Sequence, residues 1–493
     1  MQDMQDLQSL EARYDMARST RRLAALLATM ALVLGACGGT TTSPTASAGS
    51  GESAAATTAA SEAPGGVVEI RWYCCLGGGD APEQVEVEQQ VVEAFNAAHP
   101  NIHMTFEAVP YEGARDALAT MIASGNGPDI VGPVGIGGAE AFHGQWLDLQ
   151  PMIDSTGYDM SQFPESTVSL YNVGGEGQGG IPFAVYPSVL FYQKNLFEEA
   201  GLEEPPHEWG GQYTMPDGTQ VDWDYDTVRE IARLLTVDKN GKDATQDGFD
   251  PDAIVQWGFE PQRDDLRQTG AYWKAGTLVA DDGKTAQIPD AWAAAWKWFY
   301  DGMWTDNFEM TGPVFESPEA NPSDYPFFTG NVAMSQNYLW STYGVGDSGE
   351  TWDMAATPSY QGQTTAAFNA DTFRIHKDTK HPNEAFEALT YLLGDGSADL
   401  LNTYGGMPAR PTEQDAFFEG QAANFPQVID WNVAKEGVNY ADVPNFESYM
   451  PAYNESLDLL ITFGTKWQSS AGLDLDTEIE DLRTQLQAIW DSQ

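Results

Sequence analysis

Two adjacent cysteines, Cys74 and Cys75, lie between an aromatic pair and three glycines in the stretch IRWYCCLGGGD. Such a stretch could form a redox centre, a metal site, a phosphate-binding loop or the wall of a ligand pocket. A redox pair normally has two residues between its cysteines, zinc needs more ligands nearby, and a phosphate loop needs Gly-Lys-Ser/Thr. We therefore interpret the stretch as a pocket wall, where glycines let the backbone approach a ligand closely.

The chemical state of the two cysteines follows from their place at the end of an expected strand. Neighbouring residues on a strand point to opposite faces. We therefore expect Cys74 and Cys75 to be two small, buried thiols, with a disulfide between them as the alternative in an exterior compartment.

Residues for other kinds of chemistry form no recognisable pattern. The six histidines show no metal-ligand spacing, and no Gly-x-Ser-x-Gly nucleophile motif occurs. Two carboxylates can hydrolyse a glycoside, but 73 acidic residues make such pairs inevitable. Asp238, Asn240, Asp243 and Asp247 could offer oxygen ligands to calcium, yet their spacing differs from that of an EF-hand and favours a turn-rich loop. We predict no catalytic site, no metal and no cofactor.

The elements that position these residues begin at Val67. VVEIRWYCC is typical of a buried strand, and helix and strand patterns then alternate through NIHMTFEAV, EGARDALATMIASGNGP and DIVGPV. This alternation predicts a parallel sheet with helices on its faces. The ligand site of such a sheet lies beyond the carboxyl ends of its strands, where we place residues 74–80 and 129–138.

The N-terminal region is typical of a secreted, lipid-anchored protein. Arg21 and Arg22 precede a short apolar run, which ends in Leu-Gly-Ala-Cys at Cys37. This pattern indicates a signal peptide (residues 1–37) with a lipobox, in which Cys37 carries the lipid. Met16 is the more usual start for such a signal. Residues 38–66 are rich in Ser, Thr, Ala and Gly and are expected to form a disordered tether.

Composition narrows the choice of partner. The chain has 493 residues, which favours two lobes over a single core. Its formal net charge is −50, with only 23 Lys and Arg residues, so nucleic acid is excluded as a partner. The acids are scattered along the chain and not gathered in blocks, which favours a solvated acidic surface.

Five later phrases occur in a fixed order: GIPFAVYPSVLFYQKNLFEEAG, DAIVQWGFEP, FFTGNVAMSQNYLWS, HPNEAFEALTYLLG and YGGMPARPTE. In this order they resemble the carbohydrate-binding, maltose-binding-protein-like class of extracytoplasmic solute-binding proteins, which serve ATP-binding-cassette (ABC) importers. The resemblance extends from Val67 to the C-terminus. The chain departs from it at Gln193 and Asn195 in FYQKNLF and in its paired cysteines.

The resemblance implies an α/β fold of two lobes that are joined by a hinge around a ligand cleft. Lobe 1 would comprise residues 67–185 and 356–408, and lobe 2 would comprise residues 186–355 and 412–493 with the C-terminal helices. Crossings between the lobes are expected near residues 183–188, 355–360 and 407–411. The implied partners are a carbohydrate, an ABC permease and, through the lipid anchor, the membrane, with the protein itself a monomer.

A sugar presents flat C–H faces, which aromatic rings cover, and hydroxyls, which carboxylates, amides and arginine bind. Positions that match the family's phrases supply such side chains. The candidate ligand-binding residues are Trp72, Asp80, Asp129, Tyr186, Trp257, Glu260, Trp340, Asn369, Asp371 and Arg410.

The resulting function is binding without chemistry: a surface-anchored lipoprotein holds a sugar or oligosaccharide between its lobes and delivers it to an ABC permease. Two alternatives stay open. One is a surface-anchored glycoside hydrolase, and the other is a binding protein for a cationic solute such as a polyamine, which the acidity suggests.

Overall fold

The computed structural model describes residues 66–493, apart from 174, 263–267, 319, 321–324, 343–350, 443–444 and 446–449. Chain contacts separate Met1–Ala63 from Pro64–Gln493. The expected signal peptide with Cys37, and the expected tether up to residue 65, lie outside the described residues. Within the described part, no helix combines the length and the apolar character needed to cross a bilayer.

The first sheet has six strands in the order β17-β6-β16-β3-β1-β2. Their bounds are β1 (Val68–Cys74), β2 (Ile102–Ala108), β3 (Ile130–Val134), β6 (Ala184–Pro187), β16 (Phe368–Ile375) and β17 (Met407–Pro408). β1 pairs in parallel with β2 and β3, whereas β16 is antiparallel to β3 and β6. The predicted parallel start of the sheet is confirmed, and strands from much later in the chain extend it.

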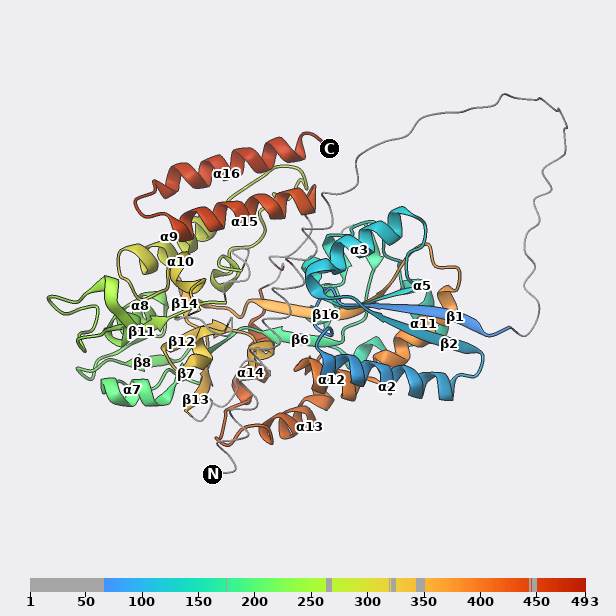
Figure 1. The fold of residues 1–493 in the computed structure, drawn as a ribbon, viewed down its shortest axis with the longest axis horizontal. Coiled ribbons are helices and arrows are strands. Elements are labelled where there is room, and N and C mark those ends of the chain that lie inside the picture. Colours follow the sequence, from blue (N-terminus) through green and yellow to red (C-terminus); the bar gives the residue numbers. More distant parts are fainter. Residues whose placement is uncertain are drawn as a thin grey trace, which may run out of the picture. The chain divides into compact units, whose positions relative to one another are not determined.

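The second sheet has five strands in the order β10-β11-β12-β7-β13. Their bounds are β7 (Val189–Gln193), β10 (Val237–Asp238), β11 (Ile254–Phe259), β12 (Val332–Asn337) and β13 (Trp352–Ala355). Three two-stranded ribbons complete the strands: β4 (Asn172–Val173) with β5 (Gly177–Gln178), β8 (Gln212–Thr214) with β9 (Gln220–Asp222), and β14 (Ser359–Tyr360) with β15 (Gln363–Thr364). The two larger sheets form the centres of two lobes. Strands β6 and β16 of the first sheet lie where the two lobes join (Figure 1).

The helices cover these sheets. Their bounds are α2 (Pro82–Ala98), α3 (Tyr111–Ala123), α4 (Ile136–Glu140), α5 (Gln150–Thr156), α6 (Glu165–Ser169), α7 (Lys194–Ala200), α8 (Tyr225–Leu235), α9 (Asp290–Trp304), α10 (Gly312–Phe315), α11 (Pro382–Leu392), α12 (Ser397–Tyr404), α13 (Pro411–Ala422), α14 (Asn432–Gly437), α15 (Tyr453–Ser469) and α16 (Leu475–Trp490). Short 3-10 turns occupy Met160–Gln162, Pro251–Ala253, Ala271–Trp273, Pro326–Thr329 and Val438–Tyr440.

Strand β1 shows why this sheet needs helices on both faces. Ile70 and Trp72 belong to the main core together with Phe95 of α2, whereas Tyr73 packs in a second core with Leu118 of α3. Side chains alternate along a strand, so a strand that is apolar at consecutive positions is buried on both sides. The sequence VEIRWYC thus encodes a central strand of a layered α/β lobe.

The chain passes from the first sheet to the second at Ser188, between β6 and β7. Ser188 donates its backbone N–H to Ala367 O at 2.8 Å, and its hydroxyl oxygen accepts from the Ala367 N–H at 2.9 Å. The return passage therefore lies at about the same level, just before β16. The sequence placed this return near residues 355–360, which is too early along the chain.

The difference arises from the ribbon β14–β15. Its turn residues, Gln361 and Gly362, both have positive φ, as a tight two-residue hairpin requires. Tyr360 stacks on Trp273 of the second lobe with ring centroids 4.0 Å apart, and Ser359 bridges to Asp224. The ribbon therefore belongs to the second lobe, and only the residues after it return to the first sheet.

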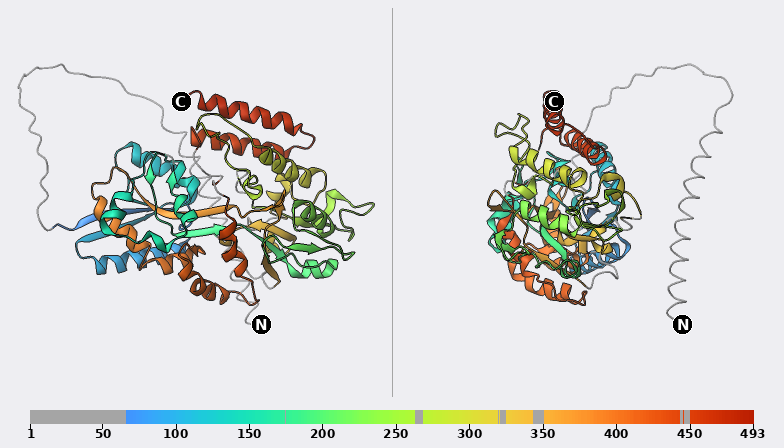
Figure 2. Two further views of the ribbon diagram at one scale, coloured as in Figure 1. Left: turned by 180° about the vertical axis from the view of Figure 1, so that it is seen from behind. Right: turned by 90° about the vertical axis from the view of Figure 1, so that its left-hand side faces the viewer.

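The C-terminal helices divide between the lobes. α15 and α16 pack against each other and against α9 of the second lobe, and Figure 2 shows the pair from two further sides. α13 instead contacts α12 and β17 of the first lobe, and α14 contacts β6, β7 and β13. The sequence placed all of residues 412–493 on lobe 2, and the contacts of α15 and α16 are the ones that match this placement.

Candidate ligand-binding site

Three aromatic rings meet where the two sheets join. Tyr186 lies on β6 of the first sheet, while Tyr338 and Trp340 follow the carboxyl end of β12 in the second. Trp340 stacks on Tyr338 with centroids 4.3 Å apart and an interplanar angle of 20°, and it meets Tyr186 edge-on at 5.0 Å. Trp340 remains partly exposed. These rings offer an aromatic platform of the kind that covers the apolar face of a sugar.

Polar groups lie beside this platform on strand β16. Asn369 pairs with Tyr186 across the ladder, and Asp371, two residues further along, points to the same face. The carboxylate of Asp371 lies between two turns: a β-carbon built on Gly77 would be 3.5 Å from its Oδ2, and one on Gly135 would be 3.1 Å from its Oδ1. The glycines after β1 and β3 thus leave room at this edge for a carboxylate.

Asn369 has an amide group that is not fully used within the described part of the protein. Its side chain is 9% exposed, and its Nδ2 has no hydrogen-bond partner among the described residues. A buried amide N–H₂ without an acceptor costs about 1–3 kcal/mol, so an acceptor supplied by a ligand would be favourable there. We refer to Tyr186, Tyr338, Trp340, Asn369 and Asp371 together as the junction site.

Two further candidates, Trp257 and Glu260, lie in the second lobe and contact other groups of the protein. Trp257 is buried within β11, paired with Val332 of β12. Glu260 follows β11 and is 1% exposed; its Oε2 accepts the backbone N–H of Met310 at 3.1 Å. The cavity that Glu260 lines has a volume of about 20 Å³, which suits a single water and not a sugar.

A family model agrees with this two-lobed arrangement. The model for bacterial extracellular solute-binding proteins matches residues 81–399, which is more than half of the chain. The chain belongs to this family. The match starts at the residue before α2 and ends in α12, so it spans both sheets of this solute-binding protein apart from β1 and β17.

Curated relatives of this solute-binding protein match over a shorter stretch. A binding protein of Brucella abortus is 32% identical over 129 residues, which is 24% of this chain and 29% of the relative. An arabinooligosaccharide-binding protein of Halalkalibacterium halodurans is 27% identical over 143 residues, covering 29% of this chain and 32% of the relative. The matched segments thus span about a third of these relatives' length.

A solved structure extends the likeness to nearly the whole fold. The ABC substrate-binding protein of Listeria monocytogenes in complex with cycloalternan superposes with a TM-score of 0.65. The alignment covers 86% of this chain and 98% of the Listeria protein at 17% sequence identity. At that identity the comparison establishes the fold, and the predicted two-lobed α/β architecture is confirmed.

Two candidates in the first lobe of this solute-binding protein lie outside the junction site and contact other groups of the protein. Trp72 is fully buried, donates its indole N–H to Gly132 O and packs against Phe106 and Phe373. Asp80 is exposed, and its Oδ2 accepts the N–H of Tyr111, the first residue of α3, at 3.0 Å. Trp72 is therefore a core residue and Asp80 caps a helix, and the structure does not bring either into the junction site.

Asp129 lies at the wrong end of its strand for a ligand contact. It precedes β3, level with Arg71 of β1, whereas the ligand edge lies beyond Val134. Its Oδ2 accepts the Arg71 N–H at 2.9 Å and its Oδ1 accepts the Thr379 hydroxyl at 2.5 Å. We had placed residues 129–138 together at the carboxyl edge, but only the residues after β3 reach it.

All three guanidinium nitrogens of Arg410 donate hydrogen bonds within the first lobe. It donates from Nε to Gln162 at 2.6 Å, from Nη1 to Leu393 O at 2.5 Å and from Nη2 to the Tyr158 hydroxyl at 3.0 Å. Its guanidinium lies 4.9 Å from the ring centroid of Phe163. Arg410 thus connects segments of one lobe, and each nitrogen of its guanidinium already has a partner within that lobe.

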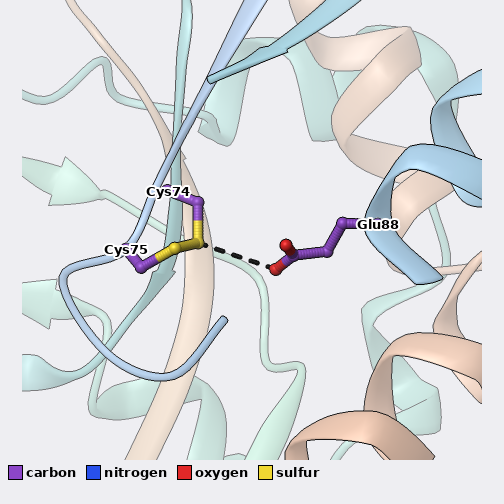
Figure 3. Close-up of side chains that lie close together, drawn as sticks. All are labelled: Cys74, Cys75 and Glu88. Atoms are coloured by element: carbon purple, nitrogen blue, oxygen red, sulfur yellow. Dashed lines mark hydrogen bonds between the residues drawn. A yellow bond between two sulfur atoms is a disulfide. The ribbon is translucent and has the colours of Figure 1, made fainter. Parts of the chain in front are cut away.

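The two cysteines form a disulfide with each other, so the expectation of two thiols was wrong, although both are fully buried as expected. β1 ends at Cys74, so the alternation of a strand does not extend to Cys75. Glu88 of α2 lies beside them (Figure 3), with Oε1 3.6 Å from Sγ of Cys74. Burial raises the pKa of the Glu88 carboxyl to about 8, although the hydrogen bond from Tyr404 acts in the other direction.

The acidic loop that begins at Asp238, which the sequence offered as a possible calcium site, is a turn stabilised by its own hydrogen bonds. Asp238 is 1% exposed, and its Oδ1 accepts the N–H groups of Asn240 at 2.7 Å and Lys242 at 3.0 Å. Its Oδ2 accepts the N–H of Asp250 at 3.0 Å. Because backbone donors occupy both oxygens, the loop has the structure of the turn that its sequence favoured.

Tyr338 is the member of the junction site that was missed from the sequence. It lies in NYLWS, two residues before Trp340, directly after the last residue of β12. The sequence signal was its aromatic side chain, two residues from Trp340 in the same phrase. The stack of Tyr338 on Trp340 could not be read from the sequence, since it depends on the local path of the chain after the strand.

Proposed function

We propose that this solute-binding protein binds a sugar or oligosaccharide at the junction site and delivers it to the permease of an ABC importer. One observation carries the proposal: a partly exposed Trp340, stacked on Tyr338, lies beside Tyr186, which pairs with an Asn369 whose buried N–H₂ has no partner among the described residues. A ring face and a free amide donor are complementary to a sugar's C–H face and hydroxyl oxygen. The names of the relatives agree, since one binds arabinooligosaccharide and one was solved with cycloalternan.

The mechanism follows from which lobe supplies each group. Trp340 and Tyr338 come from the second sheet, and Tyr186, Asn369 and Asp371 come from the first. A ligand that touches both sets interacts more strongly with a closed arrangement of the lobes than with an open one. That difference in affinity is what shifts the population toward the closed form.

The lipid anchor is part of the proposal. The sequence around Cys37 supports diacylation, which would hold the protein at the membrane beside its permease and raise the effective concentration of the complex. Cells that express the full chain would be fed an alkyne analogue of palmitate. The chain should be labelled and sediment with membranes, and Cys37→Ser should be unlabelled and released. Equal labelling of both would contradict the anchor.

A ligand panel tests the binding function. The full chain would be screened by thermal shift against monosaccharides, α- and β-linked oligosaccharides, and polyamines, and hits would be measured by isothermal titration calorimetry. We expect stoichiometric binding of one class of sugar, with a raised melting temperature. Stabilisation by polyamines alone would overturn the sugar assignment. Release of smaller sugars over hours, followed by chromatography, would overturn binding without chemistry.

A further inference from the structure

Three potential metal ligands lie together at the carboxyl end of strand β1 in the first sheet, outside the junction site. Sγ of Cys74, Sγ of Cys75 and a carboxylate oxygen of Glu88 are all within 4.8 Å of one another (Figure 3). Cys74 ends β1, Cys75 follows it, and Glu88 projects from the middle of α2. All three side chains are fully buried. Two sulfurs and one carboxylate oxygen thus converge on a point that is shielded from solvent.

The carboxylate has spare capacity at this point. Oε1 of Glu88 accepts the hydroxyl of Tyr404 at 2.5 Å, but its Oε2 has no hydrogen-bond partner among the described residues. Burying a carboxylate oxygen without a donor or a cation is costly. Helix α2 holds Glu88 there by packing its neighbours Val91, Val92 and Phe95 into the core, so the carboxylate does not reach water in this fold.

The ligand types define the class of ion. Thiolates select soft and borderline metals, and a Cys–Cys–carboxylate set suits zinc or cadmium rather than magnesium or calcium. The sulfurs are joined in a disulfide in this structure, so neither is a thiolate. Two molecules of a thiol reductant would break the S–S bond: they give two electrons and two protons, yield two Cys thiols and leave as their own disulfide. A metal ion then displaces the thiol protons, together with the proton that the Glu88 carboxyl holds below its raised pKa, to solvent.

We propose that Cys74, Cys75 and Glu88 form a redox-gated site for one zinc-class cation. While the disulfide is intact, its two sulfurs do not bind the cation. Reduction of the disulfide by a thiol makes both sulfurs available as ligands. The loop over it contains Gly79, where a β-carbon would lie 2.6 Å from Sγ of Cys74 and 2.4 Å from Oε1 of Glu88. Only glycine can close the loop over this cluster, so position 79 has no space for a side chain.

Cadmium is the probe, because cadmium–thiolate bonds absorb in the ultraviolet and report thiolate ligation directly. The full chain with Cys37→Ser would be used, since Cys37 is the third cysteine in the sequence. One sample is reduced with dithiothreitol and desalted without oxygen, and the other stays oxidised. Both are titrated with cadmium chloride, and bound metal is counted by mass spectrometry. We expect one cadmium per reduced chain with the charge-transfer band, and neither in the oxidised chain.

Variants separate this site from adventitious binding. In the reduced form, Cys74→Ser with Cys75→Ser should lose the band and the bound ion. Glu88→Gln should weaken binding by roughly tenfold or more, because losing a ligand should cost at least as much as losing a group that only supports one. Glu86→Gln is the matched control, because Glu86 lies exposed on the same helix.

Each outcome decides the proposal. Equal binding by oxidised and reduced protein would overturn the gate, and this comparison needs no variant that could misfold. Binding that survives both serines would overturn the thiolate ligands. Glu88→Gln that binds like Glu86→Gln would remove Glu88 from the site and overturn the three-ligand set. Reduced protein without bound cadmium would overturn the site altogether.

Discussion

At the junction site, Nδ2 of Asn369 is buried with no partner among the described residues, whereas Arg410, in the same lobe, has hydrogen bonds from three of its atoms to Gln162, Leu393 and Tyr158. Both residues were candidates for sugar contact. Each guanidinium nitrogen of Arg410 is hydrogen-bonded within the lobe, while the amide nitrogen of Asn369 has no partner among the described residues and lies beside an aromatic stack. A polar side chain with all its groups satisfied supports the fold, and one with a group left over is available to a ligand.

Arg410→Met gives the largest effect that this comparison predicts. The substitution leaves Gln162 Oε1 and Leu393 O without their donor, so the free energy of unfolding should fall by about 3 kcal/mol. Urea unfolding followed by tryptophan fluorescence measures it. Sugar affinity by calorimetry should stay unchanged at a temperature where the variant is folded. A variant with normal stability and weakened affinity would return Arg410 to the binding site.

Trp340→Ala tests the other side of the comparison. Loss of the platform ring should weaken sugar affinity by roughly thirtyfold or more, about 2 kcal/mol, because aromatic anchors dominate such contacts. The matched control is Trp431→Ala: Trp431 is also partly exposed and stacks on Phe418 at 5.2 Å and 26°, away from the junction site. Calorimetry with the sugar found in the panel should separate the two. Equal affinity losses would mean that the stack at Trp340 has no special role.

The sequence was most successful where one residue type has one physical use. β-branched and aromatic runs predicted the buried strands, and their order predicted the parallel start of the first sheet, because local pattern fixes strand burial. Tyr186, Trp340, Asn369 and Asp371 were selected at positions that match the phrases of the resembled family, and the structure places these four at the junction of the two sheets. Whether they bind sugar is the prediction that the experiments address.

The failures came where a role depends on a partner far along the chain. Arg410 is hydrogen-bonded to Gln162 and Tyr158, which lie about 250 positions earlier in the chain. No local sequence pattern predicts such contacts. Asp80 caps α3, whose first residue lies 31 positions later. An acid at a strand end can bind a ligand, cap a helix or join two segments, and only the tertiary structure decides among these roles.

Two asparagines, Asn369 and Asn96, extend the comparison with effects of intermediate size. Asn369→Ala should reduce sugar affinity about tenfold, near 1.4 kcal/mol, because its spare donor is lost to the ligand. Asn96 is the contrasting amide: its Nδ2 donates to Met104 O at 2.9 Å and its Oδ1 accepts the Met104 N–H at 2.7 Å. Asn96→Ala should lower the free energy of unfolding by about 1–2 kcal/mol and leave affinity unchanged. The reverse pattern would break the comparison.

His143 offers the smallest test, through pH. Its ring lies 3.2 Å from Oε2 of Glu140 and 3.6 Å from Oε1 of Glu176, with Arg374 also acting on it. The hydrogen bond to Glu140 raises the pKa of His143, with the charge of Glu176 adding to it, while burial and Arg374 oppose the shift. Folding therefore favours the protonated ring: the stabilisation is complete below the unfolded-state pKa near 6.5 and is lost as pH rises through the higher folded-state value.

The unfolding free energy of wild type relative to His143→Gln should be larger at about pH 6 than at about pH 9. Sugar affinity should be equal for the two proteins at both pH values, because none of the groups that act on His143 (Glu140, Glu176 and Arg374) belongs to the junction site. A stability difference that grows with pH would contradict the sign, and a difference in affinity would mean that a polar cluster outside the junction site also affects the ligand.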